Sequence, residues 1–160
     1  MSGKNLYLGK RWFAGQVARA GESGIVAPSY INADSKSILG GRFVAMGDAV
    51  QTCRNVSSAN DKILGVAMVI GIFHEFKPNR NLSPMTLPHG SEIVVQMAQD
   101  SQLKIGDSVT IVVKDADAGT ASHNGDIKTN FYVTDVNGSL AKIMRSEVIN
   151  QASGTGTGAQ

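Results

Sequence analysis

Hydrophobic residues recur along the middle of the chain in short runs that have the spacing of β-strands. The stretch from Lys62 to Phe73 is β-branched and apolar on both faces, which predicts a central strand of a sandwich or barrel. Further runs rich in β-forming residues occupy positions 42–46, 49–53, 92–97 and 108–113. This pattern predicts a chain built mainly from strands.

The clearest local signal is an Asn137-Gly138 pair between two runs of β-forming residues. Asn-Gly predicts a two-residue type I′ hairpin, because both central positions of that turn need a positive φ. The hairpin sets Tyr132 opposite Ile143 and Phe131 opposite Met144, so aromatic and aliphatic side chains pair across the strands.

Two further turns share the pattern apolar-Gly-Asp-x-Val, at residues 46–50 and 105–109. In each, the glycine is expected to take the left-handed conformation and the aspartate to cap the turn by accepting from nearby backbone N–H groups. Two similar corners fit a β-barrel or roll.

Glycine and proline interrupt the remaining stretches. Residues 1–37 are punctuated by glycines yet hold the only tryptophan, so we expect either an extended arm that orders against a partner or early strands packed on the protein's own core. Residues 74–90, with three prolines, and the small, polar residues 116–126 are expected to be loops. Residues 151–160, rich in Gly and Thr, are expected to be a flexible tail.

No helix of more than two turns is predicted. We expect an all-β fold: a single small β-barrel or tulip-like β-sandwich over residues 38–150, after the N-terminal stretch 1–37 and before the tail 151–160. The 160-residue length fits one domain. Its 18 glycines and 18% charged residues favour short strands and tight turns over a helical bundle.

The net charge of +2 is unevenly distributed. Residues 1–42 carry six Lys or Arg and two Asp or Glu side chains, a charge of +4, which leaves −2 for the rest. A basic front end fits either a nucleic-acid arm or an arm laid on an acidic protein surface. Because no run of like charges is present, we expect no direct nucleic-acid binding.

The longest apolar run, residues 63–73, is interrupted by two glycines and falls short of the roughly 18 residues of a membrane span. We therefore expect no membrane association. The N-terminus has no signal-peptide h-region, and the single Cys53 cannot form an internal disulfide. These features indicate a protein of a reducing compartment, or one indifferent to redox conditions.

Motifs for catalysis do not occur in the sequence, which lacks an H-E-x-x-H, a G-x-S-x-G, a Walker loop and a strand-linked G-x-G-x-x-G. The histidines His74, His89 and His123 are scattered over loop regions. Cys53 lies in a predicted strand, where a small buried hydrophobic side chain is the ordinary interpretation.

An acidic stretch has part of the spacing of a calcium loop, with Asp115, Asp117 and Asp126. Thr120 stands where an EF-hand loop requires glycine, and no flanking helices are predicted. We expect a polar hairpin loop there. The sequence thus predicts no catalytic residue, no metal site and no cofactor, and we expect the protein not to be an enzyme.

The stretch from Phe73 to Arg80 mixes aromatic and cationic side chains. Stacking on nucleic acid is one use of such residues, but their spacing matches no RNA-binding module. A protein–protein contact is the expected use, because aromatic residues and arginine are enriched in interface cores.

The turn-and-strand motifs between Gly40 and Val148 form a recognisable set. They are Gly41-Arg42-Phe43-Val44, Gly47-Asp48-Ala49-Val50, Ile63-Leu64-Gly65-Val66-Ala67, Gly90-Ser91-Glu92-Ile93-Val94-Val95, Gly106-Asp107-Ser108-Val109 and Ala141-Lys142-Ile143-Met144. In these motifs the chain resembles the head decoration or structural cement proteins of tailed bacteriophages. The resemblance implies a β-barrel or tulip-like body that binds where capsid subunits meet, often as a dimer or trimer, with an N-terminal arm that reaches across neighbours.

The resemblance also implies a location and a partner. It places the protein on the outer capsid surface of a virion, made in the host cytoplasm, with the major capsid protein as its partner. Aromatic and basic residues are the candidate capsid contacts: Tyr7, Lys10, Arg11, Trp12, Phe13, Tyr30, Phe73, Phe76 and Arg80. The alternative is another phage structural β protein, a tail, baseplate or adhesin component.

Overall fold

The computed structural model describes residues 12–20, 28–69, 71–87 and 89–145, which fold into strands and one short 3-10 helix. The elements are β1 (Val17–Arg19), β2 (Tyr30–Asn32), β3 (Ile38–Leu39), β4 (Phe43–Met46), β5 (Thr52–Asn55), β6 (Ile63–Met68), β7 (Glu75–Phe76), β8 (Asn81–Met85), β9 (Glu92–Gln96), β10 (Ser108–Ile111), η1 (Asp115–Asp117), β11 (Ala121–Ser122), β12 (Ile127–Asn137) and β13 (Leu140–Arg145). The prediction of an all-β fold is confirmed.

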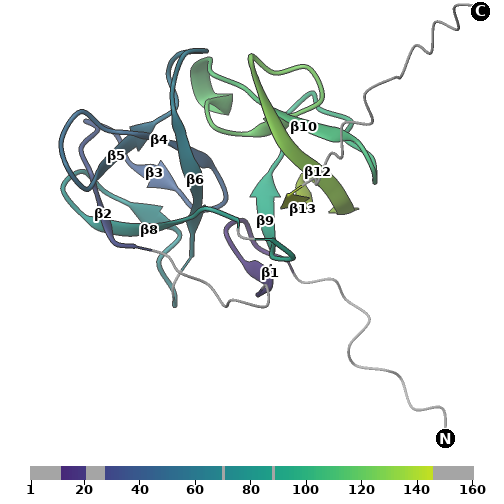
Figure 1. The fold of residues 1–160 in the computed structure, drawn as a ribbon, viewed down its shortest axis with the longest axis horizontal. Helices are drawn as coiled ribbons and strands as arrows, with labels where there is room; N and C mark the ends of the chain where they lie inside the picture. Colours follow the sequence, from purple (N-terminus) through teal and green to yellow (C-terminus); the bar gives the residue numbers. More distant parts are fainter. Residues whose placement is uncertain (1–11, 21–27, 70, 88, 146–160) are drawn as a thin grey trace, which may run out of the picture.

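Five strands close into a barrel in the order β2-β5-β4-β6-β8. Its pairings are antiparallel except that between β2 and β5, which is parallel. Strands β3 and β7 form a separate two-stranded antiparallel sheet. In Figure 1 the barrel strands occupy the left half of the molecule.

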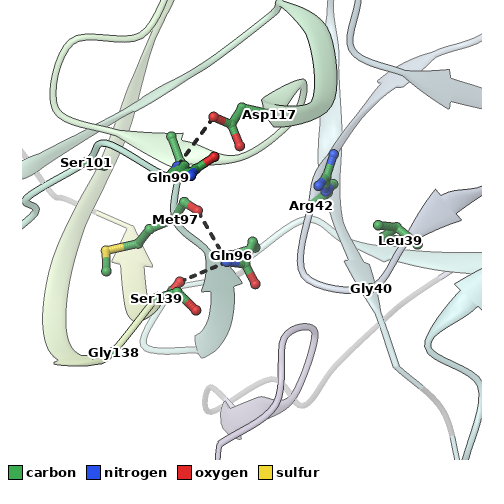
Figure 2. Close-up of a pocket in the computed structure, with 11 residues that line it drawn as sticks. Leu39, Gly40, Arg42, Gln96, Met97, Gln99, Ser101, Asp117, Gly138 and Ser139 are labelled. Atoms are coloured by element: carbon green, nitrogen blue, oxygen red, sulfur yellow. Dashed lines mark hydrogen bonds between the residues drawn. The ribbon is translucent and has the colours of Figure 1, made fainter.

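The second unit is a six-stranded antiparallel sheet in the order β1-β9-β13-β12-β10-β11. It lies to the right of the barrel in Figure 1. Hydrogen bonds connect the two units: the Gln96 N–H donates to the Gly41 carbonyl at 3.0 Å, and Arg42 Nη1 donates to the Ala116 carbonyl at 2.6 Å. Figure 2 shows Arg42 on the barrel side of this junction and Gln96 on the sheet side.

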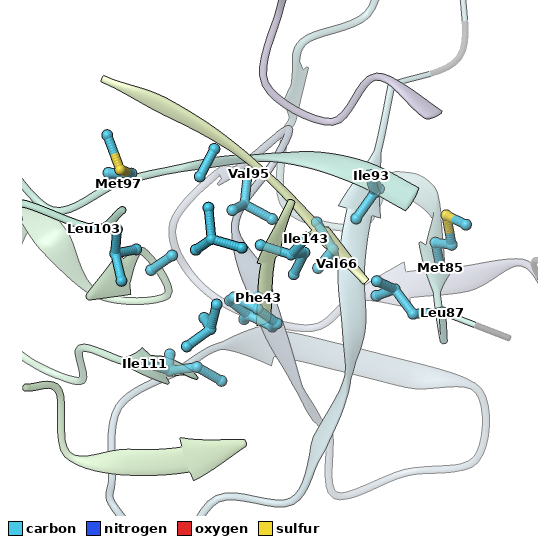
Figure 3. Close-up of a cluster of buried hydrophobic side chains, with 14 of the residues drawn as sticks. Phe43, Val66, Met85, Leu87, Ile93, Val95, Met97, Leu103, Ile111 and Ile143 are labelled. Atoms are coloured by element: carbon cyan, nitrogen blue, oxygen red, sulfur yellow. The ribbon is translucent and has the colours of Figure 1, made fainter. Parts of the chain in front are cut away.

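One cluster of buried apolar side chains runs through both units (Figure 3). Phe43 and Val66 enter it from the barrel, and Ile93 and Ile143 enter it from the sheet; each is at most 1% exposed. The Phe43 ring also stacks on that of Phe131 in β12, with centroids 5.9 Å apart. A second cluster, inside the barrel, consists of Ile38, Val44, Cys53, Ala67, Phe76 and Leu82. The barrel and the sheet therefore share a core.

The described parts of the first 37 residues pair with the rest of the fold. Strand β1 pairs with β9, and β2 closes the barrel between β5 and β8. The Gly15 N–H donates to the Val94 carbonyl at 2.8 Å, and the Gly15 carbonyl accepts from the Val69 N–H at 3.0 Å. This glycine thus joins the sheet to the segment that follows β6. Residues 1–11 of the predicted arm and the predicted tail 151–160 lie outside the described residues.

The predicted strand over residues 62–73 is central but too long. Strand β6 pairs with β4 on one side and β8 on the other, and it ends at Met68. Beyond it, Gly71 takes a φ of +68°, and Ile72 and Phe73 are 85% and 66% exposed. Strand β5 also starts later than expected, at Thr52, and the predicted loop over 116–126 contains β11.

The prediction of one long loop over residues 74–90 is wrong, because the stretch contains β7 and β8. Pro84 of β8 lies opposite Ala67 of β6. The Ala67 N–H donates to the Arg42 carbonyl and the Ala67 carbonyl accepts from the Gly41 N–H, both at 2.8 Å. Since both polar groups of Ala67 point toward the β4 side, Pro84 faces a position that needs no N–H donor from β8.

The two Gly-Asp turns are not alike. Gly106 takes a φ of +91°, and the Asp107 carboxylate accepts from the Lys104 N–H at 2.8 Å, as predicted. In the turn between β4 and β5 the positive φ of +55° falls on Gln51 instead. The Thr52 hydroxyl, rather than an aspartate, accepts from a backbone N–H in that turn.

The β12–β13 hairpin forms as predicted but with a different turn. Asn137 pairs with Leu140, so the two central residues are Gly138 and Ser139. Gly138 has a φ of +59°, and Ser139 is not among the residues with positive φ. Glycine at the first central position with positive φ is the arrangement of a type II′ turn, and the predicted type I′ turn is wrong.

The hairpin register also differs from the prediction because of this turn and a bulge between Val133 and Asp135. Phe131 lies opposite Arg145, and Tyr132 lies opposite Met144. The observed register sets Val133 opposite Ile143, and both side chains are fully buried. Burial of this pair fixes the register, since a slip of one residue would turn an apolar side chain away from the core.

Candidate interaction surface

The structure divides the predicted contact residues into separate groups. Tyr7, Lys10 and Arg11 lie outside the described residues. Trp12 and Phe13 form an N-terminal aromatic pair, while Phe73, Phe76 and Arg80 line one groove on the barrel. Tyr30 lies on β2, half-buried against the inner barrel cluster.

The N-terminal aromatic pair is held in place by the fold. The Lys142 ammonium lies 4.4 Å from the centre of the Trp12 ring, within the range of a cation–π contact. The Phe13 ring meets His74 edge to face, with centroids 5.5 Å apart, and remains 41% exposed. Both aromatic rings therefore belong to the surface of the folded molecule.

A groove of about 980 Å³ runs between the segment 71–77 and the segment 79–83, and we call it the barrel groove. Its apolar lining includes Phe76 and Leu82, which are 7% and 3% exposed and belong to the inner barrel cluster. Phe73 also lines the groove and is far more accessible, at 66% exposure. Phe76 is therefore a core residue whose role is to pack, whereas Phe73 can be covered by a partner.

Charged side chains lie around this apolar lining. Lys77 and Arg80 are exposed, as is Glu75. In the described part of the chain, no ion pair neutralises either of the two cations. The groove therefore has a net charge of +1 and offers two unpaired cationic side chains to an acidic group.

Three further exposed apolar side chains escaped the sequence analysis: Ile72, Val50 and Ile105, which are 85%, 92% and 66% exposed. Each lies beside or within a glycine-marked turn, so the neighbouring Gly71, Gly47 and Gly106 were the available signal. The predicted strands over 49–53 and 62–73 included Val50 and Ile72, whereas Ile105 began a predicted turn; all three side chains are exposed in the structure.

A second hollow, of about 500 Å³, lies at the junction between the barrel and the sheet (Figure 2). Arg42 and Asp117 are its charged lining residues. Arg42 Nη1 donates to the Ala116 carbonyl within η1 and to the Ala118 carbonyl just after it, and the Asp117 carboxylate accepts from the Gln99 N–H at 3.4 Å. Partial burial lowers the pKa of Arg42, while the nearby charge of Asp117 opposes that change. The Arg42 hydrogen bonds connect the barrel to the sheet, whereas the bond between Gln99 and Asp117 lies within the sheet unit.

Cys53 and the acidic loop have structural surroundings. Cys53 is fully buried, its thiol lies 3.7 Å from the Ile31 carbonyl, and burial raises its pKa to about 11. The Asp126 carboxylate accepts from the Val113 N–H at 3.1 Å. Within the described ranges, no group of three or more His, Cys, Asp or Glu side chains is placed to hold a metal ion. Nor does any helix in the described part of the chain have the length and apolar character to cross a membrane.

Comparisons with known proteins agree with this architecture. The structure is similar to a chain in a solved structure, "The capsid of Myoviridae Phage XM1", with a TM-score of 0.66 and 14% identity. The similarity covers 92% of this chain and 99% of that chain, and at this identity it shows the fold alone. No curated protein matches the sequence.

The family model described as "XM1 gp53 minor capsid protein" matches residues 1–145. This match spans β1 to β13 and confirms the expected resemblance to capsid-associated phage proteins. The chain belongs to the XM1 gp53 minor capsid protein family.

Proposed function

We propose that this minor capsid protein binds the outer surface of the major capsid lattice and stabilises the head, as a decoration or cement protein. The observation that carries the proposal is the exposure of Phe73 on a member of a minor capsid family. Together with Ile72 it forms an adjacent pair of large apolar side chains, 66% and 85% exposed. Covering such side chains across a subunit boundary is a direct way to stabilise a lattice, because the hydrophobic gain grows with the apolar area buried.

The proposed contacts extend from Phe73 to the N-terminal aromatic pair and to the segment before it. Trp12 and Phe13 lie at the surface, and residues 1–11 add Tyr7 together with three basic side chains. A standard interface buries about 1,600 Å² in total, and such a segment supplies part of that area. Tyr30 and Arg80 complete the proposed set, while Phe76 is left out because it packs in the core.

The proposed role needs no catalysis, no cofactor, no membrane and no direct contact with nucleic acid. We further propose that the protein occupies the capsid as a dimer or trimer. Repetition of one modest contact over a symmetric lattice then multiplies its effect through avidity.

Co-sedimentation of the purified protein with mature heads that lack it tests this proposal. We expect saturable binding at a fixed copy number per capsid subunit, and heads that resist heat or low salt better once occupied. Failure of the folded protein to bind heads would contradict the proposal. It would favour the alternative role in a tail, baseplate or adhesin, which binding to tails or host cells would reveal.

Removal of residues 1–11 tests the N-terminal contribution separately. A chain that starts at Trp12 keeps β1 and β2, and we expect it to bind heads at least about tenfold more weakly than the full chain. Equal binding of the two chains would remove Tyr7, Lys10 and Arg11 from the contact set.

A further inference from the structure

We propose that the barrel groove receives an apolar segment of the partner protein that carries at least one carboxylate side chain. The inference rests on the proposed function and gives it a chemical partner: an acidic, apolar stretch of the capsid surface. Three features of the groove lead to it, namely its apolar lining, its unpaired cations and the one carboxylate among them.

The lining determines that the occupant has apolar side chains. Phe76 and Leu82 line the groove but are only 7% and 3% exposed, since they pack in the inner barrel cluster, while Phe73 lies beside them with two thirds of its area exposed. Such an arrangement leaves apolar surface in water in the free protein. A partner side chain lying against Phe73 would remove that surface, and buried aromatic residues of this kind dominate the energetics of many interfaces.

The cations determine that the occupant has a carboxylate. Lys77 and Arg80 lie on the same groove, and neither makes an ion pair within the described residues. An arginine guanidinium offers paired N–H donors that match both oxygens of a carboxylate. Burying these cations under a purely apolar segment would leave them without compensation, which is costly.

The Glu75 carboxylate favours a protein over nucleic acid as the partner. Its carboxylate lines the same groove and reduces the net charge to +1. Nucleic-acid sites instead align several cations along the phosphate backbone, and a carboxylate among them would repel it. Charge also argues against this chain's own N-terminal segment as occupant, because residues 1–11 carry Lys4, Lys10 and Arg11 and no acidic side chain.

Substitutions in the groove test the inference by binding to heads that lack the protein. We expect Phe73→Ala and the double variant Lys77→Glu/Arg80→Glu each to weaken binding at least about tenfold. The control Lys104→Glu/Lys128→Glu makes the same change of net charge at exposed positions associated with the six-stranded sheet, and we expect it to bind like the wild type. Circular dichroism and thermal unfolding confirm that each variant is folded. If the wild type binds heads and both groove variants bind them as tightly as the wild type does, the groove inference is wrong while the proposed function stands. If the wild type itself does not bind, the proposed function is wrong.

A photo-cross-link identifies the occupant. The variant Phe73→p-benzoylphenylalanine keeps an aromatic ring at an exposed position, and irradiation on occupied heads links it to its neighbour. We expect the linked peptide, sequenced by mass spectrometry, to come from the major capsid protein and to hold Asp or Glu beside apolar residues. A peptide from a second copy of this chain, a capsid peptide without a carboxylate, a nucleic-acid adduct, or no adduct at full occupancy would each overturn the inference.

Discussion

Gly15 joins the N-terminal segment to both units, and its backbone conformation explains why the position requires glycine. It has a φ of +84°, and a Cβ there would lie 2.8 Å from the Ala67 carbonyl oxygen and 2.9 Å from the Gly41 nitrogen. Both neighbours are backbone atoms, so they cannot rotate away as a flexible side chain would. The substitution Gly15→Ala therefore combines an unfavourable φ with a steric clash.

We expect Gly15→Ala to lower the free energy of unfolding by about 2–4 kcal/mol in urea denaturation. The control is Gly106→Ala, which has a similar φ of +91° but no atom within 4 Å of the added Cβ. That variant isolates the backbone term and should lose only about 1–2 kcal/mol. Equal losses for the two variants would show that the close packing around Gly15 adds nothing.

The Asp61 side chain makes a contribution to folding stability that depends on pH. Its carboxylate accepts from Arg54 at 2.7 and 3.0 Å and from the N–H groups of Ser57 and Ser58. The side chain is only 4% exposed. The hydrogen bond from Arg54, more than the backbone bonds, lowers the pKa of Asp61 below its ordinary value of 3.8, although burial opposes that change.

We expect Asp61→Asn to cost about 2–3 kcal/mol at pH 7, because charge-assisted hydrogen bonds to a buried acceptor are lost. Since the folded-state pKa is lowered, the carboxylate contributes fully above the unfolded pKa of 3.8, and its contribution fades as the pH falls through the folded value. Urea titrations of both proteins from pH 7 to pH 2 should therefore show the stability gap closing in acid. A gap that stays constant with pH would contradict the assignment to ionised Asp61.

Among the secondary-structure elements, strand β2 limits how far the chain can be shortened from its N-terminus without loss of the fold. This strand pairs with both β5 and β8, so removing it opens the barrel and exposes two strand edges. We expect a chain that starts at Trp12 to keep a melting temperature within a few degrees of the full chain. A chain that starts at Ile38 should lose cooperative unfolding, as measured by circular dichroism. Native-like melting of the shorter chain would show that the barrel tolerates the loss of β2.

Strands could be predicted where their sequence pattern is local. The prediction failed where residues distant in the sequence determine the strand or its register. Strands β9 and β10 follow from their own β-branched residues. Strand β8 does not, because its tolerance of Pro84 depends on Ala67 directing its hydrogen bonds toward β4. The hairpin register likewise depends on burying Val133 against Ile143, a tertiary requirement that overrides the Asn137-Gly138 preference.

The interaction surface was predictable by residue type but not by arrangement. Aromatic and basic residues at 73–80 identified the barrel groove, yet burial divides Phe73 from Phe76 only three positions apart. Which of two neighbouring aromatic residues faces the core depends on β7 pairing with β3, which brings Phe76 opposite Ile38. No pattern in the 73–80 stretch itself contains that information.

For the whole molecule, the shared core predicts that the barrel and the sheet unfold together. Phe43 couples the two units, because it belongs to barrel strand β4, packs among side chains of the sheet and stacks on Phe131. We expect Phe43→Ala to lower the free energy of unfolding by about 3–5 kcal/mol. Phe73→Ala removes the same side chain at a 66% exposed position and should cost less than about 1 kcal/mol.

Hydrogen exchange read by mass spectrometry distinguishes coupled from independent units. If the core is shared, Phe43→Ala will speed exchange in peptides from β4 to β6 and from β12 to β13 by a similar factor, because opening either unit removes the packing of the other. Faster exchange confined to the barrel would mean that the sheet is stable without it. With coupled unfolding, a partner that binds the barrel groove stabilises the six-stranded sheet as well as the barrel.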